Sequence, residues 1–162
     1  MTEHPASTPR EQPWSDDRPE QGRILVLSAN PISAAIDTIA TTVGREVVVL
    51  AEDDGGPGLA SLSPSVADAV VLCDHDAPDA SQFLRDALAS PASYVAMMAS
   101  RRRAEGLRAD LEAEGVSHVD KLHVPAGHNL GGKAPGEIAL SVVAEIVAES
   151  YDRPGGSMRG PR

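Results

Sequence analysis

Cysteine, aromatic residues and long hydrophobic runs are nearly absent from this sequence. Cys73 is the only cysteine, so an intramolecular disulfide framework and a zinc site made of cysteines alone are excluded. Aromatic residues make up 2% of the 162 residues, and the core must therefore consist of Val, Ile, Leu and Ala. No apolar run approaches the ~20 residues of a membrane-spanning helix, and residues 1–18 lack the apolar stretch of a secretory signal. We therefore expect a cytoplasmic protein without a membrane partner.

Positive charge is scarce as well. Lys and Arg number 14 against 24 Asp and Glu, which gives a formal net charge of −10. Proteins that bind nucleic acid through its phosphates depend on clustered Lys and Arg, so nucleic acid is not an expected partner. Hydrophobic residues still make up 41% of the chain, which is enough to bury a core, and the length fits one domain.

The two ends of the chain differ in composition from its middle. Residues 1–22 are acidic and rich in proline and are expected to form a disordered tail, in which Trp14 is the exceptional apolar residue. Residues 152–162 are rich in glycine and proline and are expected to be flexible. The sequence thus predicts one folded domain over residues 23–151.

Within this domain, short apolar segments alternate with segments of helical periodicity. Strands are expected at residues 23–28, 46–50, 69–73, 94–98 and 121–124, with a loop at 52–64 and helices at 31–43, 78–89, 101–114 and 135–149. Gly44 and Gly115 follow two of the helices, as helix-ending glycines do. This alternation predicts a doubly wound, Rossmann-like α/β fold, with a parallel sheet of about five strands between two layers of helices.

Ligands of such folds bind beyond the carboxyl ends of the strands. The first of these loops, Ser28–Ser33, stands where dinucleotide-binding proteins carry G-x-G-x-x-G, with Ser28, Asn30 and Ser33 at the glycine positions. Their side chains could bind a phosphate. Equally, Asn30 could serve only as the helix cap, with Pro31 as the first helical residue.

The next two loops are acidic. An acid after the second strand, Asp53 in our assignment, binds ribose hydroxyls in NAD sites, although a solvated turn would look the same. The third strand is followed by Asp74, His75 and Asp76, a group suited to acid–base chemistry, ribose binding or metal binding. The alternative is a polar turn before the next helix. Cys73 is expected to be a buried strand residue rather than a nucleophile.

The last two loops carry arginine, glycine and histidine. Ser100 is the expected cap of a helix that begins with Arg101 and Arg102, and cations at that helix end indicate either a bound anion or pairing with the chain's own acids. The fifth loop, residues 123–135, contains glycines that allow close approach of a ligand and histidines that are either acid–base groups or structural residues. Its candidate residues are His123, Gly127, His128, Gly131 and Gly132.

Two stretches resemble one protein family. Residues 94–103, Y-V-A-M-M-A-S-R-R-R, and residues 122–146, L-H-V-P-A-G-H-N-L-G-G-K-A-P-G-E-I-A-L-S-V-V-A-E-I, are similar to the C-terminal Rossmann domain of the XdhC/CoxI family. Its members carry Y-[IV]-G-x-x-G-S-[RK]-[RK] and H-x-P-[IV]-G-L-x-[IL]-G-x-x-[TS]-P-x-E-I-A. The pair His75-Asp76 followed by Asp79 also resembles the family's H-D-x-x-x-D segment. The resemblance covers about residues 23–149.

The family assists the maturation of molybdenum hydroxylases such as xanthine dehydrogenase and carbon monoxide dehydrogenase. The resemblance therefore implies an accessory protein that binds a nucleotide, either NAD(P) or the molybdenum cofactor in its pterin dinucleotide form. It implies an apoenzyme or a separate maturation partner, and homodimers are common for such folds. The residues expected to hold the cofactor are Ser28, Asn30, Ser33, Asp53, Asp74, His75, Asp76, Ser100, Arg101, Arg102, Gly127, His128, Gly131 and Gly132.

The sequence departs from the family at informative places. The usual G-A-G-H-[VI]-[AG] turn is replaced by Ser28–Ser33, the glycine before Ser100 is Ala99, and the leucine of P-I-G-L is His128. We also expect that the N-terminal half of full-length members is missing. Two other functions thus stay open: an NAD(P)-dependent oxidoreductase with His75 or His128 as proton donor, and a cofactor-free interaction module.

Overall fold

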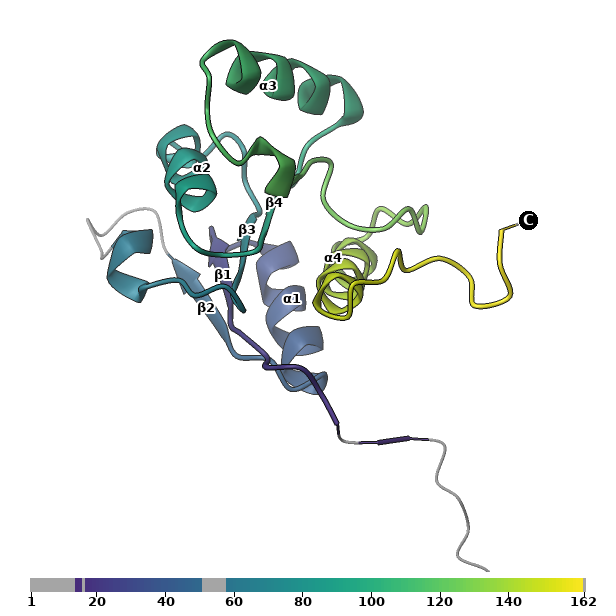
Figure 1. Cartoon of the computed structure of the whole chain (residues 1–162). Coiled ribbons are helices and arrows are strands. Elements are labelled where there is room, and N and C mark those ends of the chain that lie inside the picture. Colours follow the sequence, from purple (N-terminus) through teal and green to yellow (C-terminus); the bar gives the residue numbers. More distant parts are fainter. Residues whose placement is uncertain (1–13, 16, 51–57, 162) are drawn as a thin grey trace, which may run out of the picture.

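The structure, a computed structural model, describes residues 14–15, 17–50 and 58–161. Strands and helices alternate along these residues (Figure 1). In chain order they are β1 (Ile24–Leu27), α1 (Pro31–Thr42), β2 (Val47–Leu50), the 3₁₀ turn η1 (Leu59–Leu62), β3 (Ala69–Leu72), α2 (Ala80–Ala89), β4 (Tyr94–Met97), α3 (Arg101–Ala113), the 3₁₀ turn η2 (Val119–Lys121), β5 (Leu122–His123) and α4 (Pro135–Ser150).

The five strands form one parallel sheet in the order β2-β1-β3-β4-β5. In the register of the sheet, Ile24 of β1 stands between Val47 of β2 and Ala69 of β3. The strand order reverses between β1 and β3, and successive connections leave for opposite faces at such a point, which opens a crevice for ligands. The predicted Rossmann-like fold is confirmed.

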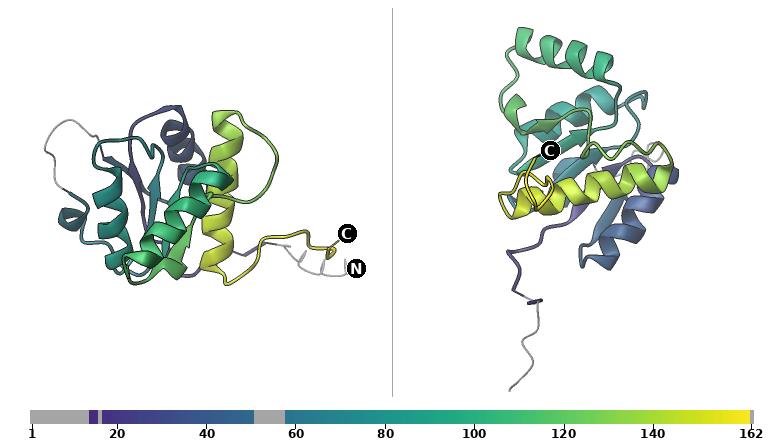
Figure 2. Two further views of the ribbon diagram at one scale, coloured as in Figure 1. Left: turned by 90° about the horizontal axis from the view of Figure 1, so that it is seen from above. Right: turned by 90° about the vertical axis from the view of Figure 1, so that its right-hand side faces the viewer.

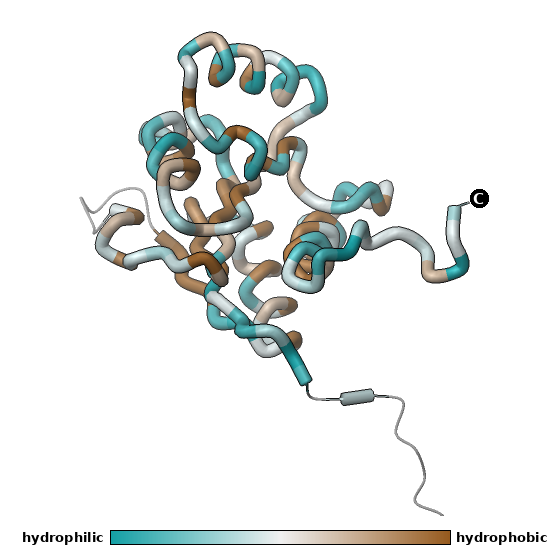
Figure 3. The backbone as a smooth tube through the Cα atoms, viewed as in Figure 1, coloured by the Kyte–Doolittle hydropathy of each residue, from teal (hydrophilic) through white to brown (hydrophobic). Residues whose placement is uncertain are grey.

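Helices cover both faces of the sheet (Figures 1 and 2). Alternate side chains of each strand point to opposite faces, so Ile24 and Val26 join the core beneath α1 and α4, whereas Leu25 and Leu27 join the core beneath α2 and α3. Both cores are mainly aliphatic, as the composition predicts, and Figure 3 shows the hydrophobic residues concentrated in the strands and on the inner sides of the helices.

Most boundaries agree with the prediction to within one residue, and the main differences lie at three places. The second helix begins at Ala80 instead of residue 78, because Asp74 to Asp79 form turns in which Asp74 Oδ1 accepts from the Asp76 amide at 2.9 Å. The fifth strand contains only Leu122 and His123, and η2 occupies the residues before it. The predicted loop at 52–64 contains η1. Gly44 and Gly115 end their helices with φ of 85° and 71°, as predicted.

The described residues before Ile24 and after Ser150 form no helix or strand, and Trp14 is 68% exposed. The predicted domain boundaries at residues 23 and 151 stay predictions. Among the described helices, none has the length and apolar character needed to cross a membrane.

Candidate functional site

A cavity of about 490 Å³ lies where β4 and β5 end. This is the edge of the sheet at which the fold predicts ligands. The first turn of α1, the start of α3, the loop between β5 and α4, and one side of α4 form its walls. The lining residues are Ile32, Met98, Ala99, Arg101, Pro125, Ala126, Gly127, His128, Asn129, Leu130, Gly131, Gly132, Lys133, Ile138 and Ser141.

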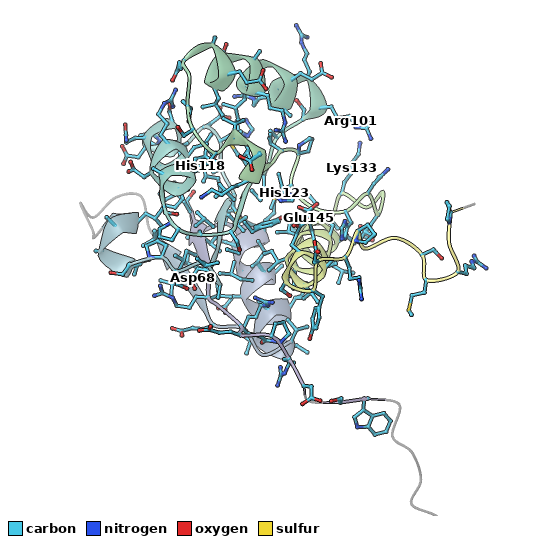
Figure 4. All side chains as sticks on the ribbon, viewed as in Figure 1. Asp68, Arg101, His118, His123, Lys133 and Glu145 are labelled. Carbon is cyan, nitrogen blue, oxygen red and sulfur yellow. The ribbon has the colours of Figure 1, made fainter. Side chains whose placement is uncertain are left out.

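Two cationic side chains reach this cavity from different elements. Arg101 is the first residue of α3, and Lys133 lies in the loop before α4 (Figure 4). In the part of the chain that the structure describes, no acidic side chain lies within 4.0 Å of either cationic group. In a protein with a net charge of −10, two uncompensated cations on one cavity provide a local attraction for an anion.

The neighbouring residues at the start of α3 have other roles. Ser100 is the helix cap, as predicted, and its Oγ accepts from the Arg103 amide at 3.2 Å. Arg103 lies 3.5 Å from Asp76, so this arginine pairs with one of the chain's own acids. Arg102 is exposed and does not line the cavity. Of the basic residues that begin α3, only Arg101 therefore faces this cavity.

The loop at the start of α1 is closed by its own side chains. Oδ1 of Asn30 accepts from the amides of Ile32 and Ser33 at 2.9 and 3.0 Å, so Asn30 caps the helix. Its Nδ2 donates to the Cys73 carbonyl at 3.2 Å, which ties this loop to the end of β3. The amides of Ile32 and Ser33, which a phosphate would use, are thus occupied. The assignment of Ser28, Asn30 and Ser33 to a cofactor stays a prediction.

The acidic loop after β3 lies by a second cavity. Nδ1 of His75 donates to the Met98 carbonyl at 3.0 Å, and Nε2 lies 3.3 Å from Asp76 Oδ2. His75 and Arg103 line a separate cavity of about 370 Å³ between α2 and α3. The structure thus divides the predicted site: Arg101, His128 and the loop glycines line the first cavity, and His75 lines the second. Asp53 lies outside the described residues.

Glycines let the loop before α4 pack closely on that helix. A Cβ at Gly127 would collide with Oγ of Ser141, and a Cβ at Gly132 would collide with the carboxylate of Glu137. Gly131 has φ of 86°, which other residues rarely adopt. Gly127 and Gly132 are therefore required by close packing on α4 rather than by a ligand. Gly131 is required by the positive φ of the turn.

A buried carboxylate behind the loop was not among the predicted site residues. Glu145 of α4 is 12% exposed, and its Oε1 accepts from the Tyr94 hydroxyl at 2.6 Å and from the Gly127 amide at 3.2 Å. Nδ1 of His123 lies 3.3 Å from Oε1, and Nδ1 of His128 lies 3.9 Å from Oε2. The rings of Tyr94 and His123 stack with centroids 4.4 Å apart. The sequence did offer a signal for this residue, because Glu145 is an acid beside the apolar residues of the last helix.

The surroundings of these groups shift their pKa values. Burial raises the pKa of Glu145, but hydrogen bonds from His123 and Tyr94 lower it more, so the net shift is downward. Burial and the nearby carboxylate raise the pKa of Tyr94, which stays a hydrogen-bond donor. Burial also raises the pKa of the Cys73 thiol to about 12, which disfavours the reactive thiolate. Cys73 is buried, as expected, but it lies one residue after the end of β3 rather than in the strand.

Comparison with known families identifies the chain. A sequence profile described as the XdhC Rossmann domain matches residues 24–146. The chain belongs to this family. The resemblance carried by the motifs around Ser100 and Gly127 is thus confirmed, and the cavity of this XdhC Rossmann domain lies between those two motifs.

Two relatives give further context for this XdhC Rossmann domain. A 73-residue stretch is 40% identical to the uncharacterized protein YqeB of Escherichia coli K12, and it covers 44% of this chain and 14% of YqeB. A crystal structure described as a xanthine dehydrogenase from Bacillus halodurans matches with a TM-score of 0.65 at 21% identity, over 85% of this chain and 45% of that one. The chain therefore spans less than half of either relative, and the second likeness supports the fold alone.

Proposed function

We propose that this protein is an accessory factor in the maturation of a molybdenum hydroxylase, and that the cavity between α3 and α4 binds the diphosphate of a nucleotide or of a nucleotide-bearing molybdenum cofactor. The observation that carries the proposal is the pair of uncompensated cations, Arg101 and Lys133, on one cavity. Membership of the XdhC family supplies the type of client enzyme.

The cavity has the size and the mixed lining of a small-molecule site. Its volume of about 490 Å³ falls within the ~300–1,000 Å³ of typical ligand pockets. Apolar side chains such as Ile32, Met98 and Ile138 line it together with Arg101 and Lys133. Apolar walls suit the rings of a nucleotide, and the cations suit its phosphates.

The loop before α4 adds backbone donors to this site. The amides of Gly131, Gly132 and Lys133 make no hydrogen bond to any other described residue. Successive free amides favour an anion. The α1 loop contributes less to this mode of binding, because Asn30 already occupies the amides of the first turn.

The first experiment is a thermal unfolding screen with NAD⁺, NADP⁺, ADP, CDP and CTP at millimolar concentration. A ligand at about 100 times its Kd stabilises the folded state by roughly 2.7 kcal/mol, which raises Tm by several degrees. We expect a shift with at least one diphosphate. Arg101→Gln and Lys133→Gln should each remove most of that shift, whereas the matched variant Arg102→Gln, which changes the charge equally outside the cavity, should retain it.

Three results would contradict the proposal. If no nucleotide shifts Tm, the chain is a cofactor-free interaction module, and capture of a molybdenum hydroxylase apoenzyme by the immobilised protein becomes the decisive assay. If Arg102→Gln abolishes the shift as completely as Arg101→Gln, nucleotides bind elsewhere on α3. Substrate-dependent oxidation of NAD(P)H would instead establish the oxidoreductase.

A further inference from the structure

We propose that residues 152–161, which follow α4, form a strap that covers Nε2 of the partly exposed His128 imidazole at the wall of the cavity, and that the strap must leave before this nitrogen can exchange protons with a ligand. Figure 1 shows this segment, in yellow, on the same side of the molecule as the loop that precedes α4. The contact of Gly155 with His128 and the pairing of His128 with Glu145 carry the proposal.

The imidazole of His128 lies between a carboxylate and the strap. Nδ1 lies 3.9 Å from Oε2 of Glu145, whereas Nε2 is buried and has no hydrogen-bond partner among the described residues. Leaving a buried polar atom without a partner costs free energy. When the strap opens, water can form a hydrogen bond with Nε2. This gain offsets part of the free energy that holds the strap in place, so the strap should open easily.

Gly155 brings the strap onto the ring. A Cβ at this position would collide with Nε2 of His128, and φ is +74°. Only glycine therefore allows the backbone to pass this close to the imidazole edge.

The rest of the strap makes few contacts with the domain. Asp152 and Arg153 donate backbone hydrogen bonds to the last turn of α4, and the backbone bond recorded beyond them, from Gly160 to Ser157, lies within the strap. Nearly all residues from 152 to 161 are exposed. Segments with few buried contacts open at low cost in free energy.

Displacement of the strap would create a new chemical group at the site. Glu145 would keep the Nδ1 side of His128 oriented, and Nε2 of this cavity-lining residue would become open to solvent, the arrangement used by imidazoles that transfer protons. A role toward a bound nucleotide rests on the proposed function, but the covering of His128 does not.

Diethyl pyrocarbonate tests the strap directly, because it modifies unprotonated imidazoles that solvent can reach. The modification rate of each histidine in the full chain is measured by peptide mass spectrometry at neutral pH. We expect His128 to react far more slowly than the exposed His118. Gly155→Ala, and separately removal of residues 153–162, should accelerate modification of His128 about tenfold or more and leave His118 unchanged.

Two glycines of the same strap are matched controls. A Cβ at Gly156 or Gly160 meets no atom within 4 Å, and Gly160 has φ of +88°, so Gly160→Ala reproduces the backbone strain without the collision. Both variants should leave the rate at His128 unchanged. Equal rates at His128 and His118 in the unaltered chain, or no acceleration in the shortened chain, would overturn the strap. If His128 is modified faster in Gly155→Ala and in the shortened chain but no nucleotide binds, the proposed function is refuted and the strap is supported.

Discussion

The hydroxyl of Tyr94 donates a 2.6 Å hydrogen bond to Oε1 of Glu145, which joins β4 to α4 across the α4 side of the sheet. The same carboxylate oxygen accepts a hydrogen bond from the Gly127 amide and lies 3.3 Å from Nδ1 of His123. It therefore also fixes the start of the loop that lines the cavity. One buried acid thus links the sheet, the last helix and the site (Figure 4).

Removal of this hydroxyl should destabilise the protein. Tyr94 is 3% exposed, and a hydrogen bond to a charged group contributes about 1.5–3 kcal/mol. We expect Tyr94→Phe to lower the free energy of unfolding by about that amount in urea denaturation. Tyr151→Phe is the control, because Tyr151 is 45% exposed and should lose almost nothing. Equal stability of the two variants would show that the bond contributes no net stability.

Two carboxylates, those of Glu145 and Asp68, should make the free energy of unfolding decrease as the pH falls into the acidic range. The net pKa of Glu145 lies below its ordinary 4.5 because its hydrogen bonds outweigh burial. The net pKa of Asp68 lies below 3.8 because hydrogen bonds from Arg23 and Ser65 likewise outweigh burial. The folded state then binds fewer protons than the unfolded state, so the stabilisation is complete above the unfolded pKa values and is lost as pH falls through the folded ones.

Urea denaturation between pH 5 and pH 3 measures this effect. The free energy of unfolding should fall steadily with pH in this range. Glu145→Gln and Asp68→Asn should each be less stable at pH 5 and lose less stability on acidification. If the free energy of unfolding of a variant falls with pH as steeply as that of the unaltered protein, the carboxylate that was replaced has the same pKa in the folded and unfolded states.

Most of the fold was predictable from the sequence, because each element carries a local signal. Apolar runs mark the strands, and Pro31, Pro135, Gly44 and Gly115 mark helix ends. The second helix was predicted two residues too long because its apolar face, from Phe83 to Leu88, does not define where the first turn begins. In the turns after β3 the Asp74 carboxylate accepts a hydrogen bond from the Asp76 amide, a local interaction that hydrophobic periodicity does not report.

The site was predictable only in part. Strand ends place Arg101 and the glycine-rich loop at one edge, but the sequence does not say to which side of the sheet each loop turns. His75 therefore lies in a different cavity from His128. The pairing of Tyr94 with Glu145 spans 51 residues and depends on α4 covering β4, a relationship that no local pattern encodes.

Glycine in the middle of α3 should be replaceable with a gain in stability. Gly106 is exposed, and a Cβ there meets no atom within 4 Å, so Gly106→Ala should stabilise the protein by about 0.5–1 kcal/mol. Gly115, at the end of the same helix, is equally uncrowded but has φ of +71°. Gly115→Ala should therefore destabilise by about 1 kcal/mol. Thermal unfolding of both variants measures these effects. If both variants have a higher Tm than the unaltered protein, the positive φ of Gly115 does not penalise alanine.

The cap of α1 should contribute measurably to stability. Asn30→Ala removes the acceptor of two amides and the donor to the Cys73 carbonyl, so a loss of about 1–2 kcal/mol is expected. Asn30→Asp retains the acceptor and should lose less. If Asn30→Ala instead strengthens nucleotide binding, the freed amides of α1 take part in the site, which would restore the first loop as a phosphate-binding turn.

Cys73 should resist thiol reagents as long as the protein is folded. Cys73 is 6% exposed, and burial raises the pKa of its thiol to about 12, so very little reactive thiolate is present at neutral pH. Reaction with a disulfide reagent should therefore require opening of the structure and should accelerate steeply as urea approaches the unfolding midpoint. Tyr94→Phe, if it destabilises as expected, should raise the native-state rate in proportion to the unfolded population. A fast rate that does not respond to urea or to this variant would place the thiol at a solvent-accessible position and contradict the packing of β3.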